Sequence, residues 1–235
     1  MVKKKTLETS LVILTRNEIN GVRVLLDLIP FEAVDEHFLV DYMSDDGTVD
    51  FIKKKGIQII NQKKPGRGEA FRLASKTAKG KYLVFFSPDG NEDPADIPRL
   101  IAKIKQGYDM VIASRFLPGS RNEEDRYFFK PRAWGNRVFT LIANLIWNKK
   151  GIYITDAING YRAITRLAFN NLKLDAEGYT VEYQMSIRAM QKKMKIAEIP
   201  TIEGERIGGE SKVKTIPTGL RFLSFLIKEI FCSIK

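Results

Sequence analysis

The sequence is poor in the residues that build disulfide frameworks and histidine-based sites. Its 235 residues include one cysteine, Cys232, and one histidine, His37. A single cysteine cannot form an internal disulfide, so we expect the chain to work in a reducing compartment. The histidine precedes a predicted strand, and we interpret it as a surface residue rather than a catalyst.

Long hydrophobic runs are also missing. The basic start is followed by an apolar stretch too short for a secretory signal, and no segment has the length and apolarity of a membrane span. We therefore expect a cytoplasmic protein. The composition, 44% hydrophobic and 29% charged, is typical of a folded chain with one large domain, or one domain and a small appendage.

Acidic residues are outnumbered by basic ones. The chain has 28 Asp and Glu against 39 Lys and Arg, a formal net charge of +11. Such a balance suits nucleic acid, an anionic membrane surface or phosphate-bearing substrates. No recognised nucleic-acid motif is present. We therefore expect no nucleic-acid partner, and a non-catalytic basic binding module remains only as an alternative.

The first half alternates short apolar runs with amphipathic segments. Apolar stripes at 22–29 and 97–104 predict helices, the second capped by Asp93 with Pro94 at its first position. The runs that predict buried strands are 11–14, 38–40, 57–60, 82–86 and 110–113. This alternation predicts an α/β fold, with a mostly parallel sheet covered by helices on both faces.

The second half is less regular, but it ends in an amphipathic pattern. Helices are predicted over 133–147 and 179–190. The last pattern places apolar residues on one helix face, at Leu220, Leu223, Ile227, Ile230 and Ile234. Such a helix either lies on a membrane surface or packs on the core or in an oligomer interface. We divide the chain into a domain at 1–213 and this helix at 214–235.

Polar residues follow the predicted strands, where parallel sheets bind their ligands. Carboxylate and amide oxygens suit Mg²⁺ or Mn²⁺, and Asp89 and Asn91 are spaced so that both could address one ion. The same Pro-Asp-Gly-Asn run is also good turn chemistry, so this segment alone leaves both readings open. The polar segments are 15–18, 41–48, 87–94 and 114–115.

Six segments, in order along nearly the whole chain, carry the pattern of one family. They read LVILTRNE (11–18), VDYMSDDGT (40–48), GRGEAFRLASKTAKGKYLVFFSPDGNEDP (66–94), DMVIASRFLPG (109–119), TDAINGYRAITR (155–166) and ERIGGESK (205–212). The set resembles family 2 glycosyltransferases of the GT-A (Rossmann-like) fold. Within that family it is most similar to the dolichyl-phosphate (polyprenyl-phosphate) mannose and glucose synthases. Each segment is weak alone, but the ordered set is specific.

The resemblance implies a site for a nucleotide-diphosphate sugar and a divalent metal. Glu18 and Asp41 would contact the base and ribose, and Asp89 with Asn91 would hold the metal, Mg²⁺ or Mn²⁺, and the diphosphate. One departure is that Ser87 stands where the family has the first aspartate of a D-x-D pair. The residues assigned to the donor are Thr15, Asn17, Glu18, Asp41, Arg67 and Asp89; for Arg67 a plain loop role is equally open.

The resemblance also implies cationic groups for the phosphate of the acceptor. Arginine offers a planar fork to phosphate and lysine a mobile charge. Lys130 or Arg137 could take the place of Arg132. The residues assigned to the acceptor phosphate are Arg115, Arg132, Arg206, Ser211 and Lys212. Those given a direct part in the transfer are Asp89, Arg115, Arg206 and Lys212.

The function implied is transfer of a hexose from GDP-mannose or UDP-glucose to a polyprenyl or dolichyl phosphate. A lipid phosphate is largely dianionic at neutral pH, so it can attack the anomeric carbon without a general base and invert that centre. A saccharide hydroxyl is the alternative acceptor, which would need Asp156 or Glu182 as base. The lipid acceptor implies peripheral docking on the cytoplasmic face of a membrane, or a membrane-protein partner.

Overall fold

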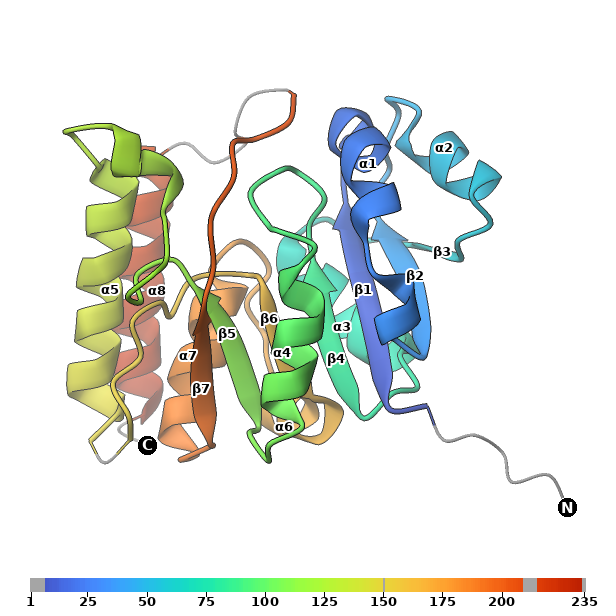
Figure 1. The fold of residues 1–235 in the computed structure, drawn as a ribbon. Coiled ribbons are helices and arrows are strands. Elements are labelled where there is room, and N and C mark those ends of the chain that lie inside the picture. The colour runs from blue at the N-terminus through green and yellow to red at the C-terminus, as the bar shows by residue number, and fades with distance from the viewer. Residues whose placement is uncertain (1–6, 150, 209–214, 234–235) are drawn as a thin grey trace, which may run out of the picture.

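The computed structural model describes residues 7–149, 151–208 and 215–233. Seven strands form one sheet in the order β3-β2-β1-β4-β6-β5-β7 (Figure 1). All neighbours are parallel except β6, which is antiparallel to both β4 and β5. The strands are β1 (Thr9–Thr15), β2 (Glu36–Asp41), β3 (Ile59–Asn61), β4 (Tyr82–Phe86), β5 (Met110–Ser114), β6 (Arg162–Thr165) and β7 (Ile196–Pro200).

Helices cover both faces of this sheet. One face packs against α1, α2 and α4, and the other against α3, α6 and α7, beyond which α5 and α8 lie side by side at the edge of the molecule (Figure 1). The α-helices are α1 (Ile19–Leu25), α2 (Thr48–Lys54), α3 (Arg67–Thr77), α4 (Asp96–Ile104), α5 (Pro131–Trp147), α6 (Arg166–Leu172), α7 (Val181–Gln191) and α8 (Thr215–Ser233). Short 3₁₀ turns lie at Leu26–Leu28, Phe31–Ala33 and Glu123–Arg126.

The sheet forms because its strands are apolar on both sides. In β1, Leu11 and Ile13 join one core cluster, while Val12 and Leu14 join the cluster on the opposite face. Successive side chains of a strand point to opposite faces, so a continuous apolar run fits only a sheet covered twice. The predicted α/β architecture is confirmed.

The structure also shows where the sequence prediction was incomplete. All five predicted strands are present, but β6 and β7 were not predicted. The helix expected from Pro94 begins at Asp96, because Asp93 first closes a turn by accepting a hydrogen bond from the Ala95 backbone N–H at 2.9 Å. Within the described residues, no helix combines the length and apolarity needed to span a bilayer.

Helix α8 packs on the core through a different face from the predicted stripe. Phe222, Phe225 and Leu226 are buried against the α5 and α7 side of the core, whereas Leu220 and Leu223 are 64% and 48% exposed. Of the two interpretations offered by the sequence, core packing therefore holds for one face of α8. Much of the predicted apolar stripe points outward. Ile234 lies outside the described residues.

Candidate functional site

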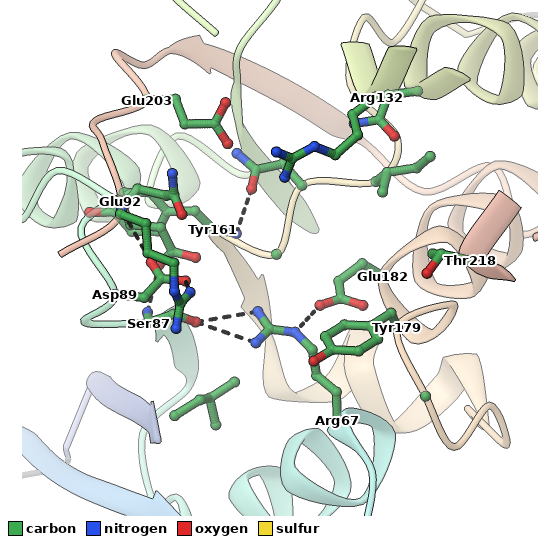
Figure 2. Close-up of a pocket in the computed structure, with 18 of the residues that line it drawn as sticks. Arg67, Ser87, Asp89, Glu92, Arg132, Tyr161, Tyr179, Glu182, Glu203 and Thr218 are labelled. Carbon is green, nitrogen blue, oxygen red and sulfur yellow. Dashed lines mark hydrogen bonds and ion pairs between the residues drawn. The ribbon is translucent and has the colours of Figure 1, made fainter. Parts of the chain in front are cut away.

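The loops at the carboxyl ends of β1, β2, β4 and β5 open onto a cavity of about 680 Å³. The N-terminal parts of α3, α5, α7 and α8 line its other side, so the cavity extends from the acidic loops to these helices. Figure 2 shows Arg67, Ser87, Asp89 and Glu182 facing one another in this cavity, with Arg132 and Thr218 farther toward α5 and α8.

Asp89, on the loop after β4, is held by a cation from the other end of the chain. Arg206 Nη1 lies 2.8 Å from Asp89 Oδ2, and Arg206 Nη2 lies 2.6 and 2.7 Å from the two carboxylate oxygens of Glu18. Burial would lower the pKa of Arg206, but the charges of Asp89 and Glu18 raise it. The three side chains join the loops after β1, β4 and β7 into one charged group.

The segment 201–208 after β7 reaches this group because Gly90 has no side chain. A Cβ at Gly90, whose φ is +103°, would lie 2.4 Å from the Glu205 carbonyl oxygen. The close approach is fixed by backbone hydrogen bonds from Ile207 to Asp89, at 2.7 Å, and from Gly204 to Asn91, at 3.2 Å. Glycine at position 90 is therefore what brings Arg206 to the β4 loop.

Arg67, the first residue of α3, projects into the same cavity. Its Nε donates to Glu182 on α7, and its two terminal nitrogens lie 3.3 and 3.4 Å from Ser87 Oγ (Figure 2). Burial would lower the pKa of Arg67, but the charge of Glu182 and the hydrogen bond to it offset this, and the pKa is raised. Arg67 is therefore a permanent cation beside Ser87 and Asp89.

Glu92 is a buried carboxyl group beneath the β4 loop. Its Oε2 accepts a hydrogen bond of 2.6 Å from the Ser87 backbone N–H. Burial first, and then the charge of Asp89, raise the pKa of Glu92 to about 8. At neutral pH Glu92 is therefore mostly protonated.

Arg115, after β5, is paired with two carboxylates. It makes hydrogen bonds of 2.7 and 3.1 Å to Asp156, which is fully buried, and one of 3.1 Å to Glu203. The carboxyl pKa of Asp156 is lowered, because Arg115 and neighbouring backbone N–H groups outweigh the opposing effect of burial. Asp156 is thus a structural partner of Arg115, which makes it unsuitable as a general base.

Arg132 and two aromatic residues line the side of the cavity farthest from Asp89. Arg132, near the start of α5, lies 3.3 Å from Glu124 and remains 42% exposed at its side chain. Phe139 of α5 and Phe222 of α8 pack with ring centroids 5.4 Å apart and ring planes tilted by 47°, and both line the cavity. The cavity is therefore charged at the sheet and partly apolar between α5 and α8.

Two of the predicted donor residues make hydrogen bonds within the protein. Asp41 is 2% exposed and accepts a hydrogen bond of 2.9 Å from Thr15 Oγ1. Asn17, with φ of +54°, bonds Ser44 and Asp45 and so ties the β1 loop to the β2 loop. Both shape the rim of the site, while Thr15 itself lines the cavity.

The residues around Asp89 fit a metal ion that is shared with a ligand. Asn91 donates its side-chain amide to the Gly204 carbonyl at 2.9 Å, which leaves Oδ1 as its possible metal ligand. No cluster of three or more His, Cys, Asp or Glu side chains suited to a metal occurs among the described residues. One carboxylate and one amide suffice for Mg²⁺ or Mn²⁺ when substrate phosphates and water complete the shell.

The structure thus gathers most of the predicted site residues into one place. Ser211 and Lys212 lie outside the described residues. Sequence reasoning missed Glu92 and Glu203, whose only signal was their place in polar loops after strands. The residues that line the common cavity are Thr15, Glu18, Arg67, Asp89, Asn91, Arg115, Arg132 and Arg206.

Comparison with known proteins identifies the class of this chain. The family model described as "Glycosyl transferase family 2" matches residues 10–172. The chain belongs to this family.

Curated relatives of known name point to the same class. The dolichol-phosphate mannosyltransferase of Pyrococcus furiosus is 26% identical, covering 94% of this chain and 64% of the relative. The undecaprenyl-phosphate mannosyltransferase of Micrococcus luteus is 28% identical, covering 86% of each. Glycosyltransferase AglJ of Haloferax volcanii is 26% identical over 80% of this chain and 60% of its own length. The chain thus spans less than two thirds of several curated relatives.

The fold is that of the GT-A glycosyltransferases. Glucosyl-3-phosphoglycerate synthase of Mycobacterium tuberculosis, solved with Mn²⁺, UDP-glucose and glycerol 3-phosphate, has a TM-score of 0.71. It is 20% identical, and the match covers 94% of this chain and 79% of that structure. The same enzyme has also been solved with Mg²⁺ and UDP. The predicted mostly parallel sheet with flanking helices is confirmed at this level.

Proposed function

We propose that this glycosyltransferase moves a hexose from a nucleotide-diphosphate sugar, GDP-mannose or UDP-glucose, to a polyprenyl or dolichyl phosphate. The observation that carries the proposal is one cavity with carboxylates and cations at the sheet and a partly apolar side, with Phe139 and Phe222, between α5 and α8. The printed names of two relatives, a dolichol-phosphate and an undecaprenyl-phosphate mannosyltransferase, point to the same acceptor class.

On the donor side, Glu18 and Thr15 meet the nucleoside and Asp89 meets the diphosphate. Asp89 and Asn91 would hold Mg²⁺ or Mn²⁺, which neutralises charge on the departing diphosphate when bound. Asn17 and Asp41 contribute by fixing the loops after β1 and β2. Arg67 stands beside Asp89, where a guanidinium suits a phosphate oxygen.

On the acceptor side, Arg132 and Arg206 bind the lipid phosphate, and Arg115 is a third cation in the lining of the cavity. Arg206 already touches Asp89, so a phosphate held by Arg206 lies close to the sugar's anomeric carbon. A dianionic phosphate needs no base, and catalysis then consists of positioning and charge neutralisation. Direct displacement inverts the anomeric centre. Ser211 and Lys212 belong to this group as predictions from the sequence.

A hydroxyl acceptor is the second candidate, because Glu182 lines the cavity and its Oε2 has no hydrogen-bond partner among the described residues. Glu182 is the remaining base candidate, since Asp156 is bound to Arg115. The ion pair between Glu182 and Arg67 weakens this candidate, because a guanidinium in contact makes a carboxylate a poorer proton acceptor.

The lipid acceptor would be met at a membrane surface. Apolar side chains recur along the exposed sides of α5 and α8, the two helices that flank the apolar end of the cavity. Helices with apolar and basic residues of this kind bind the membrane interface. We place the protein peripherally on the cytoplasmic face of a membrane. The exposed residues are Trp134, Val138, Leu141 and Leu145 on α5, and Leu220, Leu223, Ile227 and Phe231 on α8.

A transfer assay with matched acceptors tests the proposal. Radiolabelled GDP-mannose and UDP-glucose are each incubated with a short polyprenyl phosphate, and in parallel with the free polyprenol of the same length. We expect label in the lipid only with the phosphate, with inversion seen by NMR of the product. Transfer to the free polyprenol, with none to the lipid phosphate, would overturn the acceptor assignment.

A further inference from the structure

The guanidinium of Arg67 donates to the carboxylate of Glu182 from one edge, and its other edge faces the hydroxyl of Ser87 at a longer distance. Its Nε edge donates to Glu182, while the Nη1–Nη2 edge has only the two long contacts to Ser87 Oγ among the hydrogen bonds of the described residues. These distances, 3.4 and 3.3 Å, exceed those of a good N–H···O hydrogen bond. The Nη1–Nη2 edge, called the outer edge of the fork below, can therefore donate stronger hydrogen bonds to another acceptor.

The surroundings of Arg67 are built to hold this side chain in place. Gly160 gives it room, since a Cβ there would lie 2.4 Å from Arg67 Nη2. Glu182, 5% exposed at its side chain, anchors the Nε edge. The fork is thus fixed beside Asp89 rather than swinging in solvent.

The serine at position 87 decides what Arg67 can bind. An aspartate there would meet the outer edge of the guanidinium and form a buried ion pair. Serine adds no charge and gives this edge only the two long contacts. Glu182 pairs with the Nε edge and leaves the Nη1–Nη2 edge of Arg67 without a carboxylate among the hydrogen bonds of the described residues. Its positive charge is left to serve a ligand.

We propose that Ser87 frees Arg67 to be a fixed cation for the donor diphosphate, and that nucleotide-diphosphate binding in this protein therefore persists without a divalent metal. This inference rests on the proposed function. A planar fork matches two phosphate oxygens, and such charge-assisted hydrogen bonds are stronger than neutral ones. The metal then assists departure of the diphosphate but is not needed to hold it.

Calorimetric titration with GDP and UDP, in Mn²⁺ and in EDTA, tests this inference on the full chain. We expect the nucleotide that binds in Mn²⁺ to lose less than about tenfold in affinity in EDTA. Arg67→Gln should lower the metal-free affinity by more than about tenfold, the usual scale for losing charged hydrogen bonds. Arg72→Gln is the matched control, because Arg72 lies on the same helix but bonds Glu69 and the Ala176 carbonyl.

Ser87→Asp gives a second test that keeps Arg67 and its anchor. The new carboxylate should pair with Arg67, so that the variant binds nucleotide well in Mn²⁺ and at least about tenfold more weakly in EDTA. Circular dichroism confirms that each variant folds, which matters for Arg67→Gln because it leaves Glu182 buried without its cation.

The outcomes separate this inference from the proposed function. Nucleotide binding only in Mn²⁺ by the unmodified protein, or metal-free binding by Ser87→Asp equal to that of the unmodified protein, would overturn the role of Arg67 and leave the transferase intact. Absence of binding to either nucleotide, with or without metal, would overturn both.

Discussion

Arg206, after the last strand, lies 2.8 Å from Asp89, after the fourth, although 117 residues separate them. The sequence assigns Arg206 to the acceptor and Asp89 to the donor. Under the proposed function, this contact and the one between Arg206 and Glu18 would place both halves of the reaction at one group of charges. A transferase needs this closeness, because phosphate and anomeric carbon must meet within a few ångströms.

Asp89→Asn should lower transfer by at least about 100-fold, because the carboxylate that faces the metal and diphosphate loses its charge. The fold should survive, since a partly exposed ion pair contributes about 1 kcal/mol or less. Initial rates and urea denaturation check the two parts. Turnover close to that of the unmodified protein would remove Asp89 from the metal site.

Arg206→Ala should raise KM for the lipid phosphate more than it weakens donor binding. The reason is that a guanidinium fork is lost from the acceptor side. Arg126→Ala is the control, because Arg126 pairs with Glu205 in the same segment but at the exposed surface. Equal losses for donor and acceptor would argue against an acceptor role for Arg206.

Arg115→Ala should cost about 3 to 5 kcal/mol of unfolding free energy, because it leaves the fully buried Asp156 without its cation. The double variant Arg115→Ala with Asp156→Asn should recover part of this loss. Urea denaturation of Arg115→Ala, Asp156→Asn and the double variant measures the coupling. A single variant as stable as the unmodified protein would contradict the buried ion pair.

Glu92 should make stability depend on pH. Its pKa is raised to about 8 in the folded protein, above the ordinary value of 4.5 in the unfolded chain. Its contribution is therefore complete below about pH 4.5 and is lost as pH rises through about 8. Between pH 6 and 9, Glu92→Gln should lose less unfolding free energy than the unmodified protein. Parallel curves for the two proteins would contradict the raised pKa.

Leu223→Glu with Ile227→Glu should reduce binding to anionic vesicles, because both side chains lie on the outward face of α8. Sedimentation with phosphatidylglycerol and with phosphatidylcholine vesicles measures this. Leu167→Glu, at a 73% exposed position on α6, is the control and should bind as before. Unchanged binding by the double variant would remove α8 from the membrane surface.

The fold class could be predicted from the sequence because the strand–helix pattern repeats along the first half of the chain. Each apolar run in the first half is long enough to mark a strand covered on both faces, and the polar residues that follow mark the binding edge. Strand β7 escaped prediction because most of its residues are only partly buried. Strand β6 is four residues long and antiparallel, so it lacks the strand–helix alternation that revealed the others.

For the site, the sequence predicted which residues gather but not how they pair. Glu18 and Arg206, 188 residues apart, and Arg67 and Glu182, 115 apart, meet only through the sheet topology. No residue close to Arg115 in the sequence indicates that Asp156 will form an ion pair with it in the fold. Such pairings depend on tertiary packing, and they decide which cations remain for a ligand.

The binding of a nucleotide-diphosphate sugar in the cavity is the central claim, and calorimetric titration tests it most directly. The purified protein is titrated with GDP-mannose, UDP-glucose and UDP-N-acetylglucosamine, each in Mn²⁺ and in EDTA. We predict saturable one-site binding of GDP-mannose or UDP-glucose, abolished by blocking the cavity with Gly160→Trp. Absence of binding to every donor under both conditions would contradict the account.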